Sequence, residues 1–192
     1  NVTHVDGSVN PVRDKEIIDF ELQLKDLETI ETRIAKAQKL AKVGDKAGKT
    51  LLELLLKYKT HLESGQAARS IDIEEDKKPK DLFLLTDKPV MYVCNVDEAS
   101  ILTGNAHVEA VREATKEENA EILVIAAQTE ADIAELEEYE ERKMFLDDLG
   151  LEEAGVAKLI RTAYSLLNLQ TYFTAGVQEV RAWTFKKDMK AP

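Results

Sequence analysis

The sequence has 192 residues, of which 44% are hydrophobic and 33% charged, and its formal net charge is -11. A chain of this length and composition has enough apolar residues for a folded core, which excludes a disordered protein and fits one domain or a smaller domain with an excursion. The negative charge disfavours non-specific binding to nucleic acid or anionic membrane, and no apolar run reaches the roughly 20 residues of a membrane-spanning helix. The single cysteine, Cys94, allows no intrachain disulfide. Together these features predict a soluble, cytoplasmic protein without a membrane partner.

The chain opens with a short β-like stretch at residues 2–5 and a break at Asn10 and Pro11. From Asp14, the expected N-cap, apolar residues recur three or four positions apart up to Ala41, a spacing that predicts one long amphipathic helix. After residues 43–45, a second helix with the same spacing follows. Two helices joined by so short a loop must lie antiparallel, so residues 14–63 predict a helical hairpin that projects as an arm.

This hairpin is basic although the chain as a whole is acidic. Between Arg33 and His61 there are eight Lys and Arg residues against two carboxylates, Asp45 and Glu53. Such a surface could contact the phosphates of RNA, but lysine is also a good helix former, so an ordinary solvated helix face is an equally good interpretation. The candidates for phosphate contacts are Arg33, Lys36, Lys39, Lys42, Lys46 and Lys49.

Two buried strands are predicted after the hairpin. Residues 64–80, with a mixed run of charges, predict a mobile linker back to a sheet. Residues 90–94 form a continuous apolar run typical of a strand buried on both faces of a parallel sheet. A second buried strand is predicted at residues 121–127, where an apolar run follows Glu121. A helix predicted near residues 106–118 lies between them, and this strand, helix, strand order predicts a parallel crossover.

Polar residues follow both predicted strands. The first runs into Asn95-Val96-Asp97-Glu98 and the second into Gln128-Thr129-Glu130. In open α/β sheets, ligands bind just beyond the carboxyl ends of the strands, so these two turns predict a ligand site. The alternative is a pair of ordinary strand-to-helix turns with capping side chains.

The remainder of the chain predicts helices and a final β-hairpin. Residues 130–148 are acidic and helical in tendency, with Gly150 as the C-terminal cap. A helix over residues 156–167 should pack on the sheet, and Gly176 turns the chain into a strand at residues 180–185. The three histidines lie in different elements without other ligands at metal spacing, so we expect no metal site. Pairs of neighbouring carboxylates occur on acidic helices, where we expect them to face solvent, so we expect no catalytic pair of side chains.

Four segments together resemble one known family: KPVMYVCNVDE at 88–98, EADIAEL at 130–136, LLNLQTYFTAG at 166–176 and EVRAWT at 179–184. They are similar to the YchF ATPases of the Obg-related translation-factor class, and the likeness covers essentially the whole chain. The resemblance implies an α/β fold with four parts: a partial P-loop nucleotide hydrolase sheet at residues 1–13 and 81–170, an antiparallel coiled-coil arm at 14–63, a linker at 64–80, and the start of a β-rich TGS domain at 171–192.

The resemblance also implies an activity and partners: hydrolysis of ATP with Mg²⁺, and binding of ribosomal RNA through the arm. The sequence contains no Gly-x-x-x-x-Gly-Lys-Ser/Thr motif, which would hold the phosphates. We therefore expect this chain to be a monomeric piece of a longer enzyme, inactive by itself and binding neither ATP nor Mg²⁺ tightly.

The first polar turn departs from the GTP-specific relatives, which have Asn-Lys-x-Asp where this chain has Asn95, Val96, Asp97 and Glu98. The lysine that packs beneath guanine is replaced by valine, and the longer glutamate cannot place its carboxylate where the aspartate pairs with the base. A buried polar group without its partner costs about 1 to 3 kcal/mol, which predicts adenine over guanine. The expected base site consists of Asn95, Val96, Glu98, Ala127, Gln128 and Thr129, with Glu98 orienting its loop.

Two other functions fit the same sequence. The helical hairpin could make the chain a non-catalytic module that binds RNA or protein, with the α/β part as its scaffold. It could also be a structural coiled-coil adaptor. Nucleotide binding and the role of the basic residues distinguish these alternatives.

Overall fold

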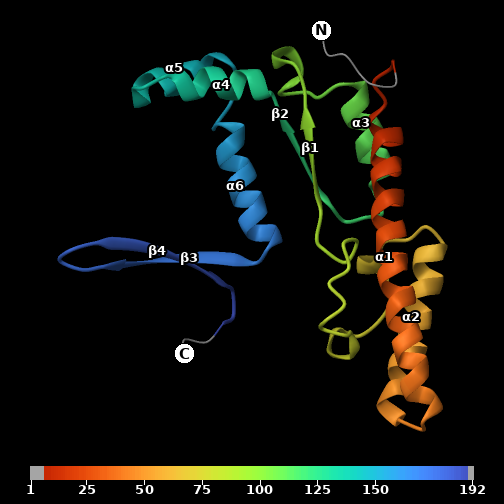
Figure 1. Ribbon diagram of the computed structural model, residues 1–192. Coiled ribbons are helices and arrows are strands. Elements are labelled where there is room, and N and C mark those ends of the chain that lie inside the picture. Colours follow the sequence, from red (N-terminus) through yellow and green to blue (C-terminus); the bar gives the residue numbers. More distant parts are fainter. Residues whose placement is uncertain (1–6, 190–192) are drawn as a thin grey trace. The chain divides into compact units, whose positions relative to one another are not determined.

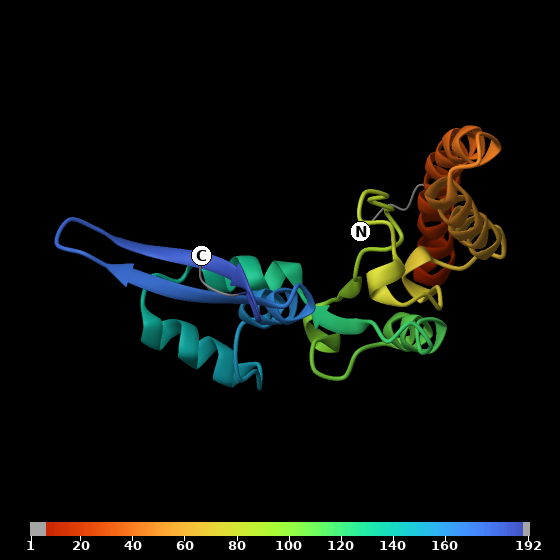
Figure 2. The same ribbon diagram turned by 90° about the horizontal axis from the view of Figure 1, so that it is seen from below.

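The computed structural model describes residues 7–189 and divides into two compact units, Asn1–Pro89 and Val90–Pro192. The first unit is a helical hairpin with the segment that follows it, and the second combines a parallel strand pair, helices and a β-hairpin (Figures 1 and 2). The β-like stretch expected at residues 2–5 lies outside the described residues. Within residues 7–189, no helix has the length and hydrophobicity that crossing a bilayer requires.

The first helix, α1, spans Pro11–Lys42. Its N-cap is Asn10, whose side chain accepts a hydrogen bond from the backbone N–H of Arg13 (3.1 Å). Pro11 suits the first helical position because no intrahelical N–H bond is needed there. The expectation that Asp14 caps this helix is therefore wrong, and Asp14 lies within the first turn, where its charge complements the helix dipole.

The second helix, α2, spans Lys46–Glu63 and is capped by Asp45, whose carboxylate accepts hydrogen bonds from two N–H groups of the first turn. Gly44 makes the sharp turn between the helices with a φ of 90°. The helices approach closely near this end, since a Cβ on Gly48 would lie 2.7 Å from the Cβ of Leu40. The structure thus contains the predicted helical hairpin, joined at residues 43–45 (Figure 1).

The core of the first unit lies between the two helices and the segment that follows them. That segment, predicted to be a mobile linker at residues 64–80, contains two short 3-10 turns, Ala68–Ser70 and Glu75–Lys77. It packs against the hairpin and contributes side chains to its core. The buried apolar residues of this core are Ile30, Ile34, Ala37, Leu55, Tyr58, Leu62, Ala68, Leu82 and Leu84.

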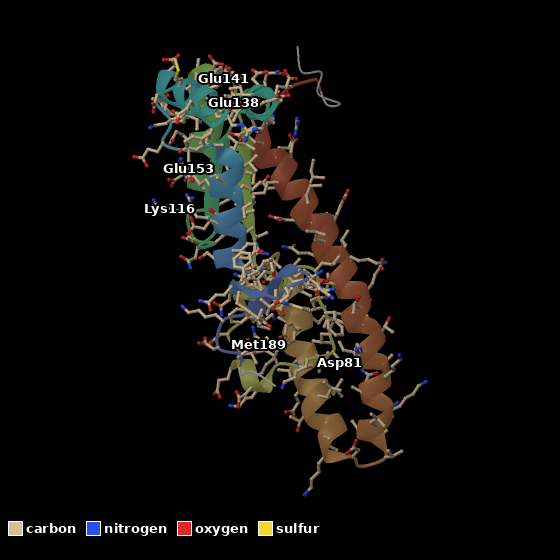
Figure 3. All side chains as sticks on the ribbon, turned by 90° about the vertical axis from the view of Figure 1, so that its left-hand side faces the viewer. Asp81, Lys116, Glu138, Glu141, Glu153 and Met189 are labelled. Atoms are coloured by element: carbon tan, nitrogen blue, oxygen red, sulfur yellow. The ribbon has the colours of Figure 1, made fainter. Side chains whose placement is uncertain are left out.

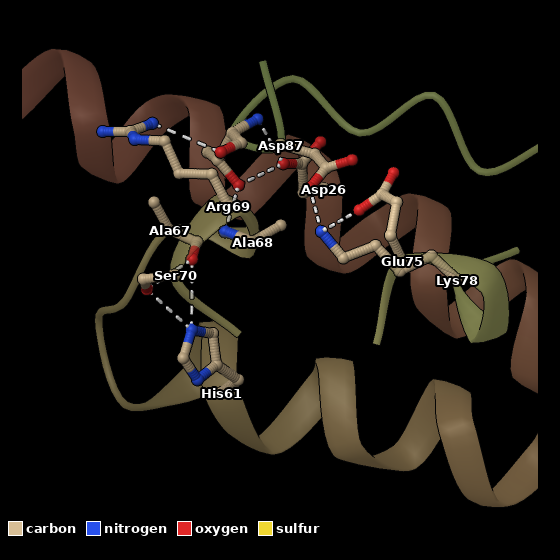
Figure 4. Close-up of polar contacts among 10 residues, drawn as sticks. Asp26, His61, Ala67, Ala68, Arg69, Ser70, Glu75, Lys78 and Asp87 are labelled. Atoms are coloured by element: carbon tan, nitrogen blue, oxygen red, sulfur yellow. Dashed lines mark hydrogen bonds and ion pairs between the residues drawn. The ribbon is translucent and has the colours of Figure 1, made fainter. Parts of the chain in front are cut away.

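A buried carboxylate on α1 holds residues 85 and 86, which lie a few positions beyond that segment, in place. Asp26 is 1% exposed, and its two oxygens accept hydrogen bonds from the N–H of Leu85 (2.7 Å) and from the N–H and hydroxyl of Thr86 (2.8 and 2.7 Å). The Thr86 hydroxyl oxygen in turn accepts from the N–H of Ala68 (2.9 Å; Figure 4). Because the bonds of Thr86 and Ala68 are buried, these groups depend on their partners for a hydrogen bond, whereas the bond of Leu85 is only partly buried.

The second unit begins with a strand, helix, strand sequence: β1 (Met91–Asn95), α3 (Ala106–Ala114) and β2 (Glu121–Ile125). The two strands are parallel, so the predicted pairing and the mixed α/β class are confirmed. The expected burial of β1 on both faces is wrong for the described residues. There the parallel sheet has two strands, and Val93 is 42% exposed.

The chain continues through three helices and an antiparallel β-hairpin: α4 (Ala127–Glu135), α5 (Tyr139–Asp148), α6 (Gly155–Leu166), β3 (Leu169–Ala175) and β4 (Val180–Lys186). The acidic stretch predicted as helical at residues 130–148 is therefore two helices. Gly150, with a φ of 70°, follows the end of α5 as predicted. Helix α6 contacts β2 and β3.

Replacing Asp26 by alanine should destabilise the first unit by about 3 kcal/mol, because the buried N–H of Thr86 and the partly buried N–H of Leu85 both lose their acceptor. Asp26→Asn should cost less, since one acceptor oxygen remains. The matched control is Asp19→Ala on the same helix, whose carboxylate pairs with Lys15 in a partly exposed ion pair (2.6 Å) and should contribute at most about 1 kcal/mol. Urea unfolding followed by circular dichroism measures both. Equal losses for Asp26→Ala and Asp19→Ala would contradict the assigned role.

Candidate functional site

The carboxyl ends of β1 and β2 lie next to each other. In the parallel register, Asn95 at the end of β1 is opposite Ile125 at the end of β2. The N–H of Val96 donates to the carbonyl oxygen of Ile125 (2.8 Å), which extends the pairing one residue beyond β1. The two polar turns predicted from the sequence therefore begin at the same edge of the sheet.

A side chain also joins the two turns. The Oδ1 of Asn95 accepts a hydrogen bond from the N–H of Ala127 (2.9 Å). Ala127 is the first residue of α4, and the N-cap residue, Ala126, offers no side-chain acceptor to the unpaired N–H groups of that helix. Asn95 thus caps α4 from the neighbouring strand. Its carbonyl oxygen keeps a second lone pair and its amide nitrogen keeps two donors, on a residue that is exposed.

The residues that follow Asn95 form a short, capped turn. The Oδ1 of Asp97 accepts a hydrogen bond from the N–H of Ser100 (3.0 Å) and so caps a 3-10 turn, Glu98–Ser100. Asp97 therefore has a structural role. Val96 is half-buried, and Glu98 is exposed at the start of the turn. This arrangement places the amide of Asn95, the apolar side chain of Val96 and the carboxylate of Glu98 one after another beyond the carboxyl end of β1.

The predicted contributions of Gln128 and Thr129 are less direct. Both lie in the first turn of α4 instead of a loop. Gln128 is exposed, but its Nε2 donates to the Oδ1 of Asp132 along the same helix (3.0 Å). The expectation that Thr129 lines the site needs correction, because this residue is 1% exposed and packs inside the unit.

Sequence reasoning missed the role of Glu130, which caps α6 from α4. Its carboxylate oxygens accept hydrogen bonds from the N–H groups of Gly155 (2.6 Å) and Val156 (3.0 Å). The residue before α6, Ala154, has no side chain that could cap the helix. A predicted helix with no Ser, Thr, Asp or Asn at its start was the available signal that an acceptor must come from another element.

Other titratable groups near the strands indicate no separate chemistry. Burial raises the pKa of the Cys94 thiol, and the charge of Arg112 opposes this shift, so the thiol is protonated at neutral pH and suited to packing. Among residues 7–189, no group of three or more His, Cys, Asp or Glu side chains is placed to hold a metal ion. Glu138 and Glu141 are exposed and project from the region of α4 and α5 (Figure 3).

The second candidate surface is the basic end of the helical hairpin. Five of its lysines are exposed, and none of them forms an ion pair with another described residue: Lys36, Lys39, Lys42, Lys46 and Lys49. We call these the arm lysines. Arg33 differs, because its guanidinium donates to the Oδ2 (2.7 Å) and the carbonyl oxygen (2.5 Å) of Asp81. Its predicted role as a free phosphate contact therefore needs correction.

Comparison with known proteins gives consistent matches over the whole chain. It is 52% identical over 196 residues to the "Ribosome-binding ATPase YchF" of Bacillus subtilis (strain 168), and 46% identical over 194 residues to the protein of the same name from Escherichia coli O157:H7. Each match covers 100% of this chain and 53% of the relative, so the chain spans about half the length of these proteins.

A solved structure, that of the Schizosaccharomyces pombe YchF GTPase, matches with a TM-score of 0.87 and 30% sequence identity, over 100% of this chain and 53% of that one. No family model matches the sequence. The relatives differ in the base that their names imply, ATPase in one case and GTPase in the other.

Proposed function

This chain belongs to the YchF family, and from that membership we propose that it is part of a ribosome-associated P-loop nucleotide hydrolase in which the tips of β1 and β2 hold the purine base. The hydrogen bond between Asn95 and Ala127 is the observation that carries this proposal, because it joins the two polar turns that parallel pairing brings to one exposed edge. The expected ligand contacts come from Asn95, Val96 and the start of α4, while Glu98 orients the first turn.

The donors and acceptors of Asn95 match adenine. Adenine presents an acceptor, N7, next to a donor, the 6-amino group, and an asparagine amide can pair with both at once. The amide nitrogen of Asn95 would donate to N7, and the second lone pair of Oδ1 would accept from the amino group. Guanine has an oxygen at position 6, which would face Oδ1 as a second acceptor.

The surroundings of Asn95 support the same preference. The N–H of Ala127 is already bonded to Oδ1, so it is not a free donor for the oxygen of guanine. Val96 supplies an apolar surface where GTP-specific relatives have lysine. A mismatched base in such a site loses about 1 to 3 kcal/mol, which is roughly 5- to 150-fold in affinity.

The phosphates and Mg²⁺ must be bound by other residues of the full-length protein, because this sequence contains no glycine-rich phosphate-binding motif. We therefore propose that the chain alone does not hydrolyse ATP and binds it weakly. In the full-length protein its contribution is selection and placement of the base. The β3–β4 hairpin would belong to a TGS domain.

The arm lysines would contact ribosomal RNA. Lys36, Lys39 and Lys42 lie on the last turns of α1, and Lys46 and Lys49 lie on the first turn of α2, so both helices bring positive charge to the same end of the hairpin. Unpaired, exposed ammonium groups bind phosphates without first breaking an ion pair. The acidic remainder of the chain would repel RNA and so favour contact through this end.

Full-length protein should bind ATP more tightly than GTP, and Asn95→Ala should lower ATP affinity by about 1 to 3 kcal/mol and remove most of the preference. Calorimetric titration with both nucleotides measures this. Asn119→Gly is the matched control: it deletes an exposed amide just before β2, at a φ of 51° that glycine adopts readily. Unchanged ATP affinity in Asn95→Ala would show that the base site is wrongly assigned and would favour a non-catalytic module.

Reversing Lys36, Lys39, Lys42 and Lys46 to glutamate should weaken co-sedimentation with ribosomes. It should also reduce the slope of log affinity against log salt by up to about four, since each lysine that contacts a phosphate contributes about one. The control reverses Lys88, Lys143, Lys158 and Lys187, which are exposed outside the hairpin and change the net charge equally. If both variants lose the same affinity, or neither does, RNA is not bound by the arm.

A further inference from the structure

Glu130 connects three elements around the second base-recognition turn. Its side chain extends from the first turn of α4 to the first turn of α6, where it accepts from two consecutive N–H groups, those of Gly155 and Val156. Its own backbone N–H bonds to the carbonyl oxygen of Ala126 (3.0 Å), the buried residue between β2 and α4. The residue is therefore fixed at both its main chain and its carboxylate.

The fit around Glu130 leaves no spare room. A Cβ on Gly155 would lie 2.7 Å from the Oε1 of Glu130 and 3.0 Å from the Cγ2 of Ile125, so any larger residue there would displace the Glu130 carboxylate from its present position. The first turn of α6 thus lies against the last residue of β2 and the first turn of α4 at the same time. The backbone between these two contacts includes Ala127.

The position of Ala127 decides whether its N–H reaches Asn95. Ala127 and Glu130 are three residues apart on α4, within one helical turn, so a shift of one moves the other. If α4 moves away from the sheet, the 2.9 Å bond to Oδ1 of Asn95 lengthens, and the amide of Asn95 is free to rotate. Fixing α4 therefore fixes the orientation of the amide.

We propose that Glu130 is a positioning residue for purine selection: by holding the first turn of α4 against α6, it keeps Asn95 oriented toward the base without touching the ligand itself. This inference rests on the proposed function and adds a residue that lies outside the base contacts. The carboxylate is needed because it offers acceptor oxygens to both N–H groups, whereas glutamine keeps one acceptor oxygen and adds a donor.

The test uses full-length protein and two ligands, ATP and tripolyphosphate, which lacks a base. Glu130→Ala should weaken ATP binding about tenfold, reduce the preference over GTP and leave tripolyphosphate affinity unchanged, because one positioning contact of this kind is worth about that factor. Glu130→Gln should fall between the wild type and alanine. Glu135→Ala, an exposed glutamate at the far end of α4, is the control and should change neither affinity.

Each result decides the inference. If ATP and tripolyphosphate affinities fall together, Glu130 merely supports the fold, and if ATP affinity is unchanged, it does not position the site. Should Glu130→Ala fail to fold, the ratio of the two affinities in Glu130→Gln decides in the same way. Failure of the proposed function is separate: in that case Asn95→Ala also leaves ATP binding intact, whereas failure of this inference alone leaves the effect of Asn95→Ala in place.

Discussion

The hydrogen bond from the Ala127 N–H to the Asn95 Oδ1 is the contact on which the site depends. Parallel pairing brings the ends of β1 and β2 to one edge, but pairing alone would leave the asparagine amide free to rotate. The N-terminus of α4 lacks a cap of its own, and Asn95 satisfies it while presenting its remaining donors and acceptor outward. The Asn95 side chain thereby caps α4 and also sets the hydrogen-bond donors and acceptor that a base would meet.

In the first unit, some charged side chains form contacts that stabilise the fold, and others are exposed and could bind a partner. Charged groups that hold the first unit together are paired, as in Asp26 with the backbone at residues 85 and 86, or Arg33 with Asp81. The arm lysines are exposed and unpaired among the described residues. The positive charge of the arm lysines is therefore not neutralised by an ion pair with a described carboxylate, which suits an interaction with a polyanion.

Local patterns in the sequence predicted much of this structure. Apolar spacing gave the helical hairpin, and two apolar runs gave the parallel strands that bring Asn95 and Ala127 together. These local patterns could not predict contacts between residues that are distant in the sequence. Arg33 pairs with Asp81, 48 positions away, and Glu130 caps a helix that starts 25 positions later. The start of α1 was misplaced because Asn10 and Asp14 are both good caps, and Pro11 favours the earlier one. Burial of Thr129 likewise depends on packing that periodicity does not encode.

Photolabelling of the full-length protein with an azido-adenine analogue of ATP, followed by peptide mapping, locates the purine site on the chain. We expect the label to attach within residues 95–98 and at the start of α4, and excess ATP to prevent the labelling more effectively than excess GTP. Labelling confined to other segments, such as the helical hairpin, would contradict a purine site formed by the two strand ends.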